Sequence, residues 1–195
     1  MPSVKQVVRK FIPRPIQTPP APVETEDSAY SAICSVYDEE ARPTQRLVDL
    51  AIEAVERAMK NVQLRGTVWP GEELCLIGGL MLAMRPRVVV QIGSNEKASE
   101  VVKKYLEGGR YQHLDRVGQE ISEADLILID GPADGEFEKR VLDDLARLKF
   151  AKPPIVMLSD TRRWEMLRFV RSIRFPKLDM TSFASWTGTM LVEMA

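Results

Sequence analysis

The chain has 195 residues, of which 45% are hydrophobic and 28% charged, and its formal net charge is -1. These values are typical of one globular domain and exclude a general electrostatic attraction to nucleic acid. The sequence has no apolar run of the ~20 residues that a membrane span needs and no hydrophobic centre of a secretion signal near its start, so we expect a cytoplasmic protein. Its two cysteines, Cys34 and Cys75, have no CxxC spacing, which argues against a disulfide framework and a cysteine zinc site.

The first 28 residues differ in composition from the rest. They are rich in proline, and their first 22 residues contain four basic and no acidic side chains, namely Lys5, Arg9, Lys10 and Arg14. We expect a flexible basic tail at 1–28 and a single domain at 29–195. The alternative is a short basic helix that contacts a protein partner or an anionic surface.

Two helices are predicted before the centre of the chain. Thr44 to Lys60 has one apolar stripe with charged residues on the other side, and Glu72 to Met84 is almost entirely apolar. We expect both to pack on a sheet. Gly78 and Gly79 weaken the second helix but allow a neighbour to approach closely.

Arg87 to Ser99 (RVVVQIGSNEKAS) is the segment around which the chain is organised. Its apolar run predicts a buried parallel strand, Gly93 permits a sharp turn, and Ser94 or Asn95 can cap the following helix. Exposed amides at the start of a helix favour a polar or anionic ligand, and open α/β sheets bind ligands beyond the carboxyl ends of their strands.

The remaining elements alternate between strands and helices. Arg110 to Glu123 is too short for a full strand, helix and strand. The later patterns predict strands at Ala124 to Asp130 and Pro154 to Asp160, helices at Gly135 to Phe150 and Thr161 to Arg174, and an antiparallel hairpin made of Leu178 to Phe183 and Thr187 to Met194. In the last of these helices we expect Trp164 to be available for packing.

This order resembles the class I S-adenosylmethionine-dependent methyltransferases, in particular small-molecule O-methyltransferases. The likeness is carried by RPRVVVQIGSNEKAS, by LILIDGP as the family's fourth strand, by IVMLSD as its fifth, and by KLDMTSFASWTGTMLVE as its terminal hairpin. The resemblance implies a doubly wound, mostly parallel Rossmann-like α/β sheet with a C-terminal antiparallel hairpin, in three layers. It also implies S-adenosylmethionine as cofactor and a small hydroxylated molecule as substrate.

The sequence departs from the family in its cofactor motif. The family commonly has an acid in place of Gln91 and further glycines near Asn95 and Lys97, whereas here only Gly93 remains. The acid that ends the family's second strand and holds the ribose has Asp115 and Glu120 as its substitutes.

The resemblance assigns a cofactor site to Gln91, Gly93, Ser94, Asn95, Asp115 and Asp130. Asp130 and Asp160 end neighbouring strands and are candidate Mg²⁺ ligands, with Asp134 as a third; the alternative is that each acid caps the helix that follows. His113 and Asp130 are the candidate catalytic residues, since a histidine can accept a proton near neutral pH.

Two functions follow from these observations. The first is methylation of a small hydroxylated molecule, and the second is a non-catalytic binding or assembly module that has lost the cofactor, as a homo-oligomer or with a protein partner at the N-terminal tail. The arginines of Thr161 to Arg174 give a weaker nucleic-acid or acidic-ligand alternative to a solvated helix face.

Overall fold

A six-stranded mixed sheet with the strand order β2-β1-β3-β4-β6-β5 forms the centre of the computed structural model. The structure describes residues 41–61, 64, 73–93, 95–181, 183–184 and 187–194. The strands are β1 (Val88–Gly93), β2 (Arg110–Leu114), β3 (Leu126–Asp130), β4 (Ile155–Ser159), β5 (Lys177–Asp179) and β6 (Thr189–Glu193). The tail boundary that we predict at residue 28 lies outside the described residues.

The strand pairing confirms the predicted α/β architecture. β1 pairs in parallel with both β2 and β3, and β3 pairs in parallel with β4. β6 is antiparallel to β4 and to β5, so the terminal hairpin lies beyond the third predicted parallel strand as expected. The carboxyl ends of β1, β2, β3 and β4 therefore meet at one edge of the sheet.

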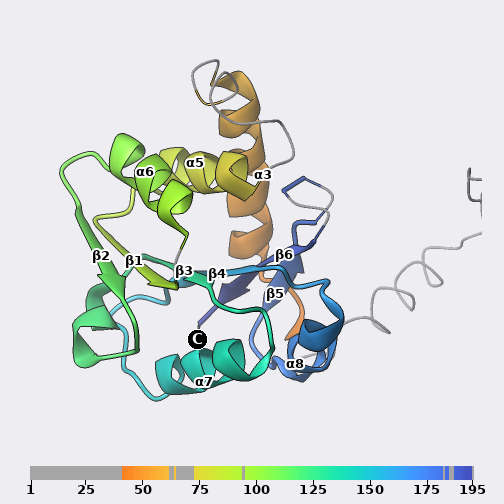
Figure 1. The fold of residues 1–195 in the computed structure, drawn as a ribbon. Coiled ribbons are helices and arrows are strands. Elements are labelled where there is room, and N and C mark those ends of the chain that lie inside the picture. Colours follow the sequence, from red (N-terminus) through yellow and green to blue (C-terminus); the bar gives the residue numbers. More distant parts are fainter. Residues whose placement is uncertain are drawn as a thin grey trace, which may run out of the picture. The chain divides into compact units, whose positions relative to one another are not determined.

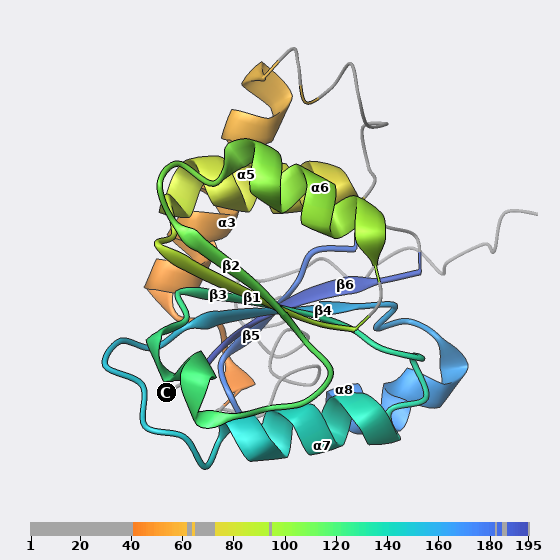
Figure 2. The same ribbon diagram turned by 60° about the vertical axis from the view of Figure 1, so that its left-hand side comes forward.

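Helices cover both faces of the sheet and give the predicted three layers (Figures 1 and 2). One face carries α3 (Gln45–Lys60), α5 (Glu73–Met84) and α6 (Glu96–Tyr105). The other carries α7 (Glu136–Leu145), α8 (Leu167–Ser172) and the 3-10 helices η2 (Gln119–Glu123) and η3 (Trp164–Met166). None of the helices in the described ranges combines the length and apolar character needed to cross a membrane.

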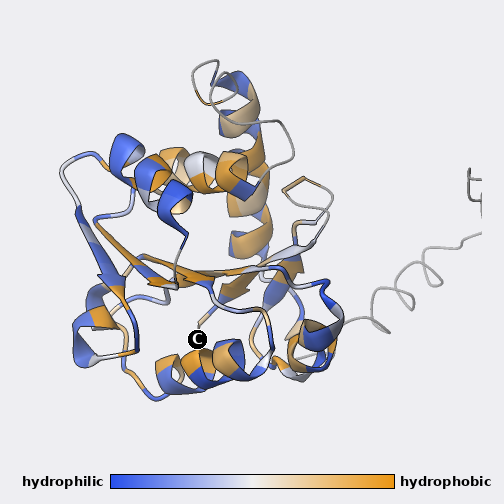
Figure 3. Ribbon diagram, viewed as in Figure 1, coloured by the Kyte–Doolittle hydropathy of each residue, from blue (hydrophilic) through white to orange (hydrophobic). Residues whose placement is uncertain are grey.

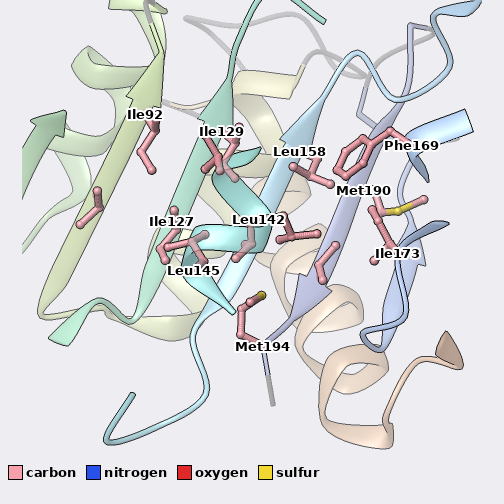
Figure 4. Close-up of a cluster of buried hydrophobic side chains, with 14 of the residues drawn as sticks. Ile92, Ile127, Ile129, Leu142, Leu145, Leu158, Phe169, Ile173, Met190 and Met194 are labelled. Atoms are coloured by element: carbon pink, nitrogen blue, oxygen red, sulfur yellow. The ribbon is translucent and has the colours of Figure 1, made fainter. Parts of the chain in front are cut away.

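Two buried clusters hold these layers together. In the first, Figure 4 shows β-strand side chains such as Ile127 and Ile129 facing Leu142 and Leu145 of α7. In the second, the opposite face of the same strands packs against α3, α5 and α6. A Cβ at Gly79 would lie 2.2 Å from the carbonyl oxygen of Ala54, so this glycine allows α3 and α5 to touch, as predicted.

The segment Arg110 to Glu123 is too short for a strand, a helix and a further strand, as predicted. It contains one strand, β2, which had no signal of its own in the sequence, and the only helix that follows it there is the short η2. β2 was hard to predict because it is an edge strand with polar side chains, and Figure 3 shows it as hydrophilic beside the hydrophobic β1. Since β3 and β4 correspond to the family's fourth and fifth strands, the family's third strand has no counterpart here.

Several side chains and boundaries also differ from the prediction. Met59, which its pattern puts in the apolar stripe of α3, is 43% exposed, and Trp164, which was expected to be available for packing, is 84% exposed. The predicted helix at Thr161 to Arg174 is shorter and starts as η3, in which Met166 is buried and Trp164 is exposed.

Candidate functional site

A pocket of about 380 Å³ lies at the carboxyl ends of β1, β2 and β3. Its lining includes four residues that the sequence singled out, and the full set is Gly93, His113, Asp115, Asp130, Gly131, Pro132 and Phe137. A pocket of this size at this edge is large enough for a small molecule or a cofactor. The parallel sheet thus brings together Gly93 and Asp130, which are 37 positions apart in the chain.

His113 lies at one side of this pocket with its ring against β1. Its Nε2 is hydrogen-bonded to the carbonyl oxygen of Gly93. Because a carbonyl oxygen only accepts, Nε2 must carry the proton in this contact. In a neutral imidazole, Nδ1 is then the nitrogen that can accept a proton from another group.

Gly93 is required by the sheet itself. Its φ is 124°, and a Cβ there would lie 1.9 Å from the carbonyl oxygen of Asp130. β1 and β3 therefore approach each other at their carboxyl ends more closely than any side chain permits. This packing reason for the glycine holds whether or not a cofactor binds.

Gln91 is almost fully buried, at 1% exposure, and does not line the pocket. Its amide nitrogen donates to the backbone carbonyl of Asn95, and its amide oxygen accepts from the hydroxyl of Tyr111, both at 2.8 Å. Burial raises the pKa of Tyr111, so the hydroxyl stays protonated and able to donate. Gln91, which stands where the family commonly has an acid, thus forms its hydrogen bonds with Asn95 and Tyr111 inside the protein.

Asn95 caps the N-terminus of α6, which is one of the two caps that the sequence predicted. Its side-chain oxygen accepts from the backbone nitrogen of Ala98 at 3.1 Å. Its side chain is also hydrogen-bonded to Asp130, which opposes the effect of burial on the pKa of that carboxyl. Ser94, the other candidate, lies outside the described residues.

Asp130 and Asp160 lie close enough to influence each other. Burial raises the pKa of Asp130, and the charges of Asp160 and Glu138 add to this rise. Asp160 has a φ of 55° and pairs with Arg163 at 3.2 Å. A non-glycine residue in this conformation at the end of a strand is an unusual backbone feature that is frequent near functional sites.

A third acid, Glu73, is influenced by these two carboxyls, and no motif of the sequence predicted it. Glu73, in the first turn of α5, accepts a hydrogen bond from the hydroxyl of Ser159 at the end of β4. Burial raises its pKa from 4.5 to about 7, and the charges of Asp130 and Asp160 contribute to the rise. The signal that could have found it is a carboxyl at the start of an otherwise apolar helix, ELCLIGGLMLAM.

The predicted metal ligands do not form a group of three. Within the described ranges, no three His, Cys, Asp or Glu side chains are grouped so that they could hold a metal ion. Asp134, the predicted third ligand, instead accepts from the backbone nitrogens of Glu136 and Phe137, both at 2.9 Å, at the start of α7. The described residues therefore provide no group of three ligands for Mg²⁺.

No protein-family model and no curated protein matches the chain. Among solved structures, it is similar to the O-methyltransferase TomG from Streptomyces achromogenes, a structure in complex with SAM, at 13% identity and a TM-score of 0.47 over 86% of this chain and 96% of that one. It is also similar to an O-methyltransferase from Bacillus cereus in complex with SAH, at 13% identity and a TM-score of 0.44 over 86% of this chain and 97% of that one. The SAH-bound Podospora anserina methyltransferase PaMTH1 is similar at 14% identity and a TM-score of 0.39 over 90% of this chain and 99% of that one.

The fold follows from the sheet of this chain. Four parallel strands in the order β2-β1-β3-β4 are followed by the antiparallel C-terminal hairpin that the sequence resemblance implied, with β6 between β4 and β5. The chain has the class I methyltransferase fold. It is a shortened version of that fold, because the third strand of the family is missing between β2 and β3.

Proposed function

We propose that this protein binds S-adenosylmethionine in the pocket at the ends of β1, β2 and β3 and methylates a hydroxyl group of a small molecule. The observation that carries the proposal is the meeting of Gly93, His113, Asp115 and Asp130 in one pocket. These residues come from three different strands, and the proposal gives each of them a role except Gly93, which the sheet requires in any case.

Asp115 is the group best suited to hold the cofactor. It directly follows β2, it is exposed in the pocket, and no hydrogen bond or ion pair joins its carboxylate to another described residue. A free carboxylate can accept two hydrogen bonds, as the neighbouring hydroxyls of a ribose require. Asp130 would face the opposite end of the same ligand.

The reaction needs a nucleophile aligned with the methyl group and a group that accepts its proton. The substrate oxygen attacks the methyl carbon, the carbon–sulfur bond breaks with its electron pair going to sulfur, and the hydroxyl proton passes to a base. Nδ1 of His113 is our candidate base, because its Nε2 is already bonded to Gly93. Since the described residues provide no group of three ligands for Mg²⁺, no step is assigned to a metal.

Calorimetry and thermal unfolding with S-adenosylmethionine and S-adenosylhomocysteine test the cofactor site. At a hundred times the dissociation constant, a ligand that binds only the folded protein raises its stability by ~2.7 kcal/mol. For a domain of this size that corresponds to a melting shift of roughly 5 to 11 °C. Asp115→Asn should reduce the shift. Glu107→Gln, which neutralises an exposed acid outside the pocket, should not.

A second candidate function is a non-catalytic binding module with this fold. It is favoured by Gln91, whose amide is bonded to Asn95 and Tyr111 inside the protein. No shift with either ligand at millimolar concentration would favour the module. A shift that Asp115→Asn and Glu107→Gln change equally would remove the assignment of Asp115.

A further inference from the structure

The outer side of η3 and α8 carries an exposed tryptophan among arginines. Trp164 is 84% exposed, more than any other large hydrophobic residue in the described ranges. The segment from Thr161 to Arg174 has one acid, Glu165, and five exposed arginines, namely Arg162, Arg163, Arg168, Arg171 and Arg174. The net charge of -1 for the whole chain thus hides a local concentration of positive charge.

Helical spacing gathers part of this segment into one face. Arg168 and Arg171 are three residues apart in α8, which puts them on the same side of consecutive turns, and the exposed Trp164 lies about one turn before them, in η3. The opposite side is buried in the core through Met166 and Phe169. We call the exposed side, made of Trp164, Arg168 and Arg171, the Trp164 face. Figure 1 shows α8 at the margin of the layer that also contains α7.

The two arginines of this face are not neutralised. Arg162 pairs with Asp179 at 3.0 Å and Arg163 with Asp160 at 3.2 Å. Arg168 and Arg171, by contrast, form no ion pair with any residue of the described ranges. Their charges are therefore available to an anionic partner.

Arg168 also lines the neighbouring hollow between α7 and α8, but the other residues of this hollow do not extend the positive surface. This hollow has a volume of about 420 Å³, and its charged lining is balanced between the bases Lys139, Arg140 and Arg168 and the acids Asp134, Glu136 and Glu165. The Trp164 face is therefore small, suited to a few units of a chain molecule.

We propose that the Trp164 face binds single-stranded nucleic acid. Trp164 would stack on an unpaired base, and Arg168 and Arg171 would contact the phosphates on either side. An exposed aromatic ring among cations is the usual platform for single strands, whose bases are free to stack. A duplex keeps its bases stacked within the helix and gives the indole no partner.

Other anionic partners fit this face less well. An acidic peptide could pair with Arg168 and Arg171 but would leave the indole of Trp164 without a function. An anionic membrane would need an apolar helix face to insert, and the apolar side of η3 and α8 is buried in the core. The proposal does not depend on whether the chain binds S-adenosylmethionine.

Fluorescence anisotropy of a labelled oligothymidylate of twelve nucleotides, titrated with the full chain, tests the proposal. Trp164→Ala should weaken binding at least about fivefold, and Trp164→Phe should retain most of it, because stacking needs a ring. The double variant Arg168→Gln with Arg171→Gln should reduce the slope of the logarithm of the binding constant against the logarithm of the salt concentration by about 1.4. Each phosphate contact to a single strand contributes about 0.7 to this slope.

The matched control removes two arginines elsewhere. Arg85→Gln with Arg87→Gln makes the same change of charge at the exposed start of β1 and should leave binding unchanged. Equal losses in both double variants would overturn the proposal, and so would oligothymidylate binding that none of the variants weakens. Failure of the wild-type chain to bind at 100 µM would overturn it as well. Equal binding of polyglutamate or of phosphatidylserine vesicles, insensitive to Trp164→Ala, would point instead to an acidic protein or a membrane.

Discussion

The raised pKa of Glu73 predicts that neutralising this side chain stabilises the protein at high pH. Glu73 reaches from the first turn of α5 to Ser159 at the end of β4, and it is largely shielded from water. Its charged form is disfavoured chiefly by burial and secondarily by the charges of Asp130 and Asp160. Glu73→Gln keeps an oxygen that can accept from Ser159 and removes the charge.

The sign and size of the effect follow from proton linkage. The pKa is 4.5 in the unfolded chain and about 7 in the folded one, so the folded protein binds more protons between these values. Its stability therefore falls as the pH rises from 4.5 through 7 and is constant above. A rise of this size corresponds to a loss on the order of 3 kcal/mol between the two limits, or roughly 6 to 12 °C in melting temperature.

Thermal and urea unfolding of the wild type and Glu73→Gln between pH 4 and 8.5 measures this directly. The two proteins should have similar stability near pH 4, and the variant should be more stable above pH 7. Glu100→Gln, which removes an exposed acid of α6, is the control and should follow the wild type. If the advantage of Glu73→Gln were the same at every pH, or were absent above pH 7, Glu73 would not be a carboxyl with a raised pKa.

Two further changes test the edge of the sheet. Gly93→Ala should lower the free energy of unfolding, measured in urea, by more than about 3 kcal/mol, because the new Cβ would collide with the carbonyl of Asp130. The control is Gly108→Ala. Gly108 also has a positive φ, 69°, but no atom lies within 4 Å of the new Cβ, so this change should cost only about 1 kcal/mol. Tyr111→Phe should cost about 1 to 3 kcal/mol in the same measurement, because it leaves the buried oxygen of Gln91 without its donor; an unchanged stability would show that another group satisfies that oxygen.

The fold could be predicted because the central strands have a local signal. β1, β3 and β4 are covered on both faces, so each is a short continuous apolar run that can be recognised without knowing its neighbours. β2 has no such signal. It forms the edge of the sheet, its residues RYQHL are polar and partly exposed, and only its pairing with β1 makes it a strand.

The site could be predicted only as far as the order of the strands determines it. The residues that end β1, β2 and β3 meet because parallel strands end at one edge, and His113, Asp115 and Asp130 line one pocket there. Glu73 was missed because its contact with Ser159 spans 86 residues. Trp164 differs from the prediction because the segment begins as the 3-10 helix η3, in which Met166 is buried and Trp164 is exposed.

Gln91 shows why a single substitution in a motif cannot be interpreted alone. The family commonly has an acid at this position, and a buried charge requires partners. Here the position holds a neutral amide, which donates to the carbonyl of Asn95 and accepts from the hydroxyl of Tyr111. Tyr111 lies on β2, so the substitution is explained by a strand that the sequence did not predict. Gln91 does not line the pocket, whereas Asp115, His113 and Asp130 do. For that reason Asp115→Asn, and not a change at Gln91, separates a working cofactor site from a fold that only keeps its shape.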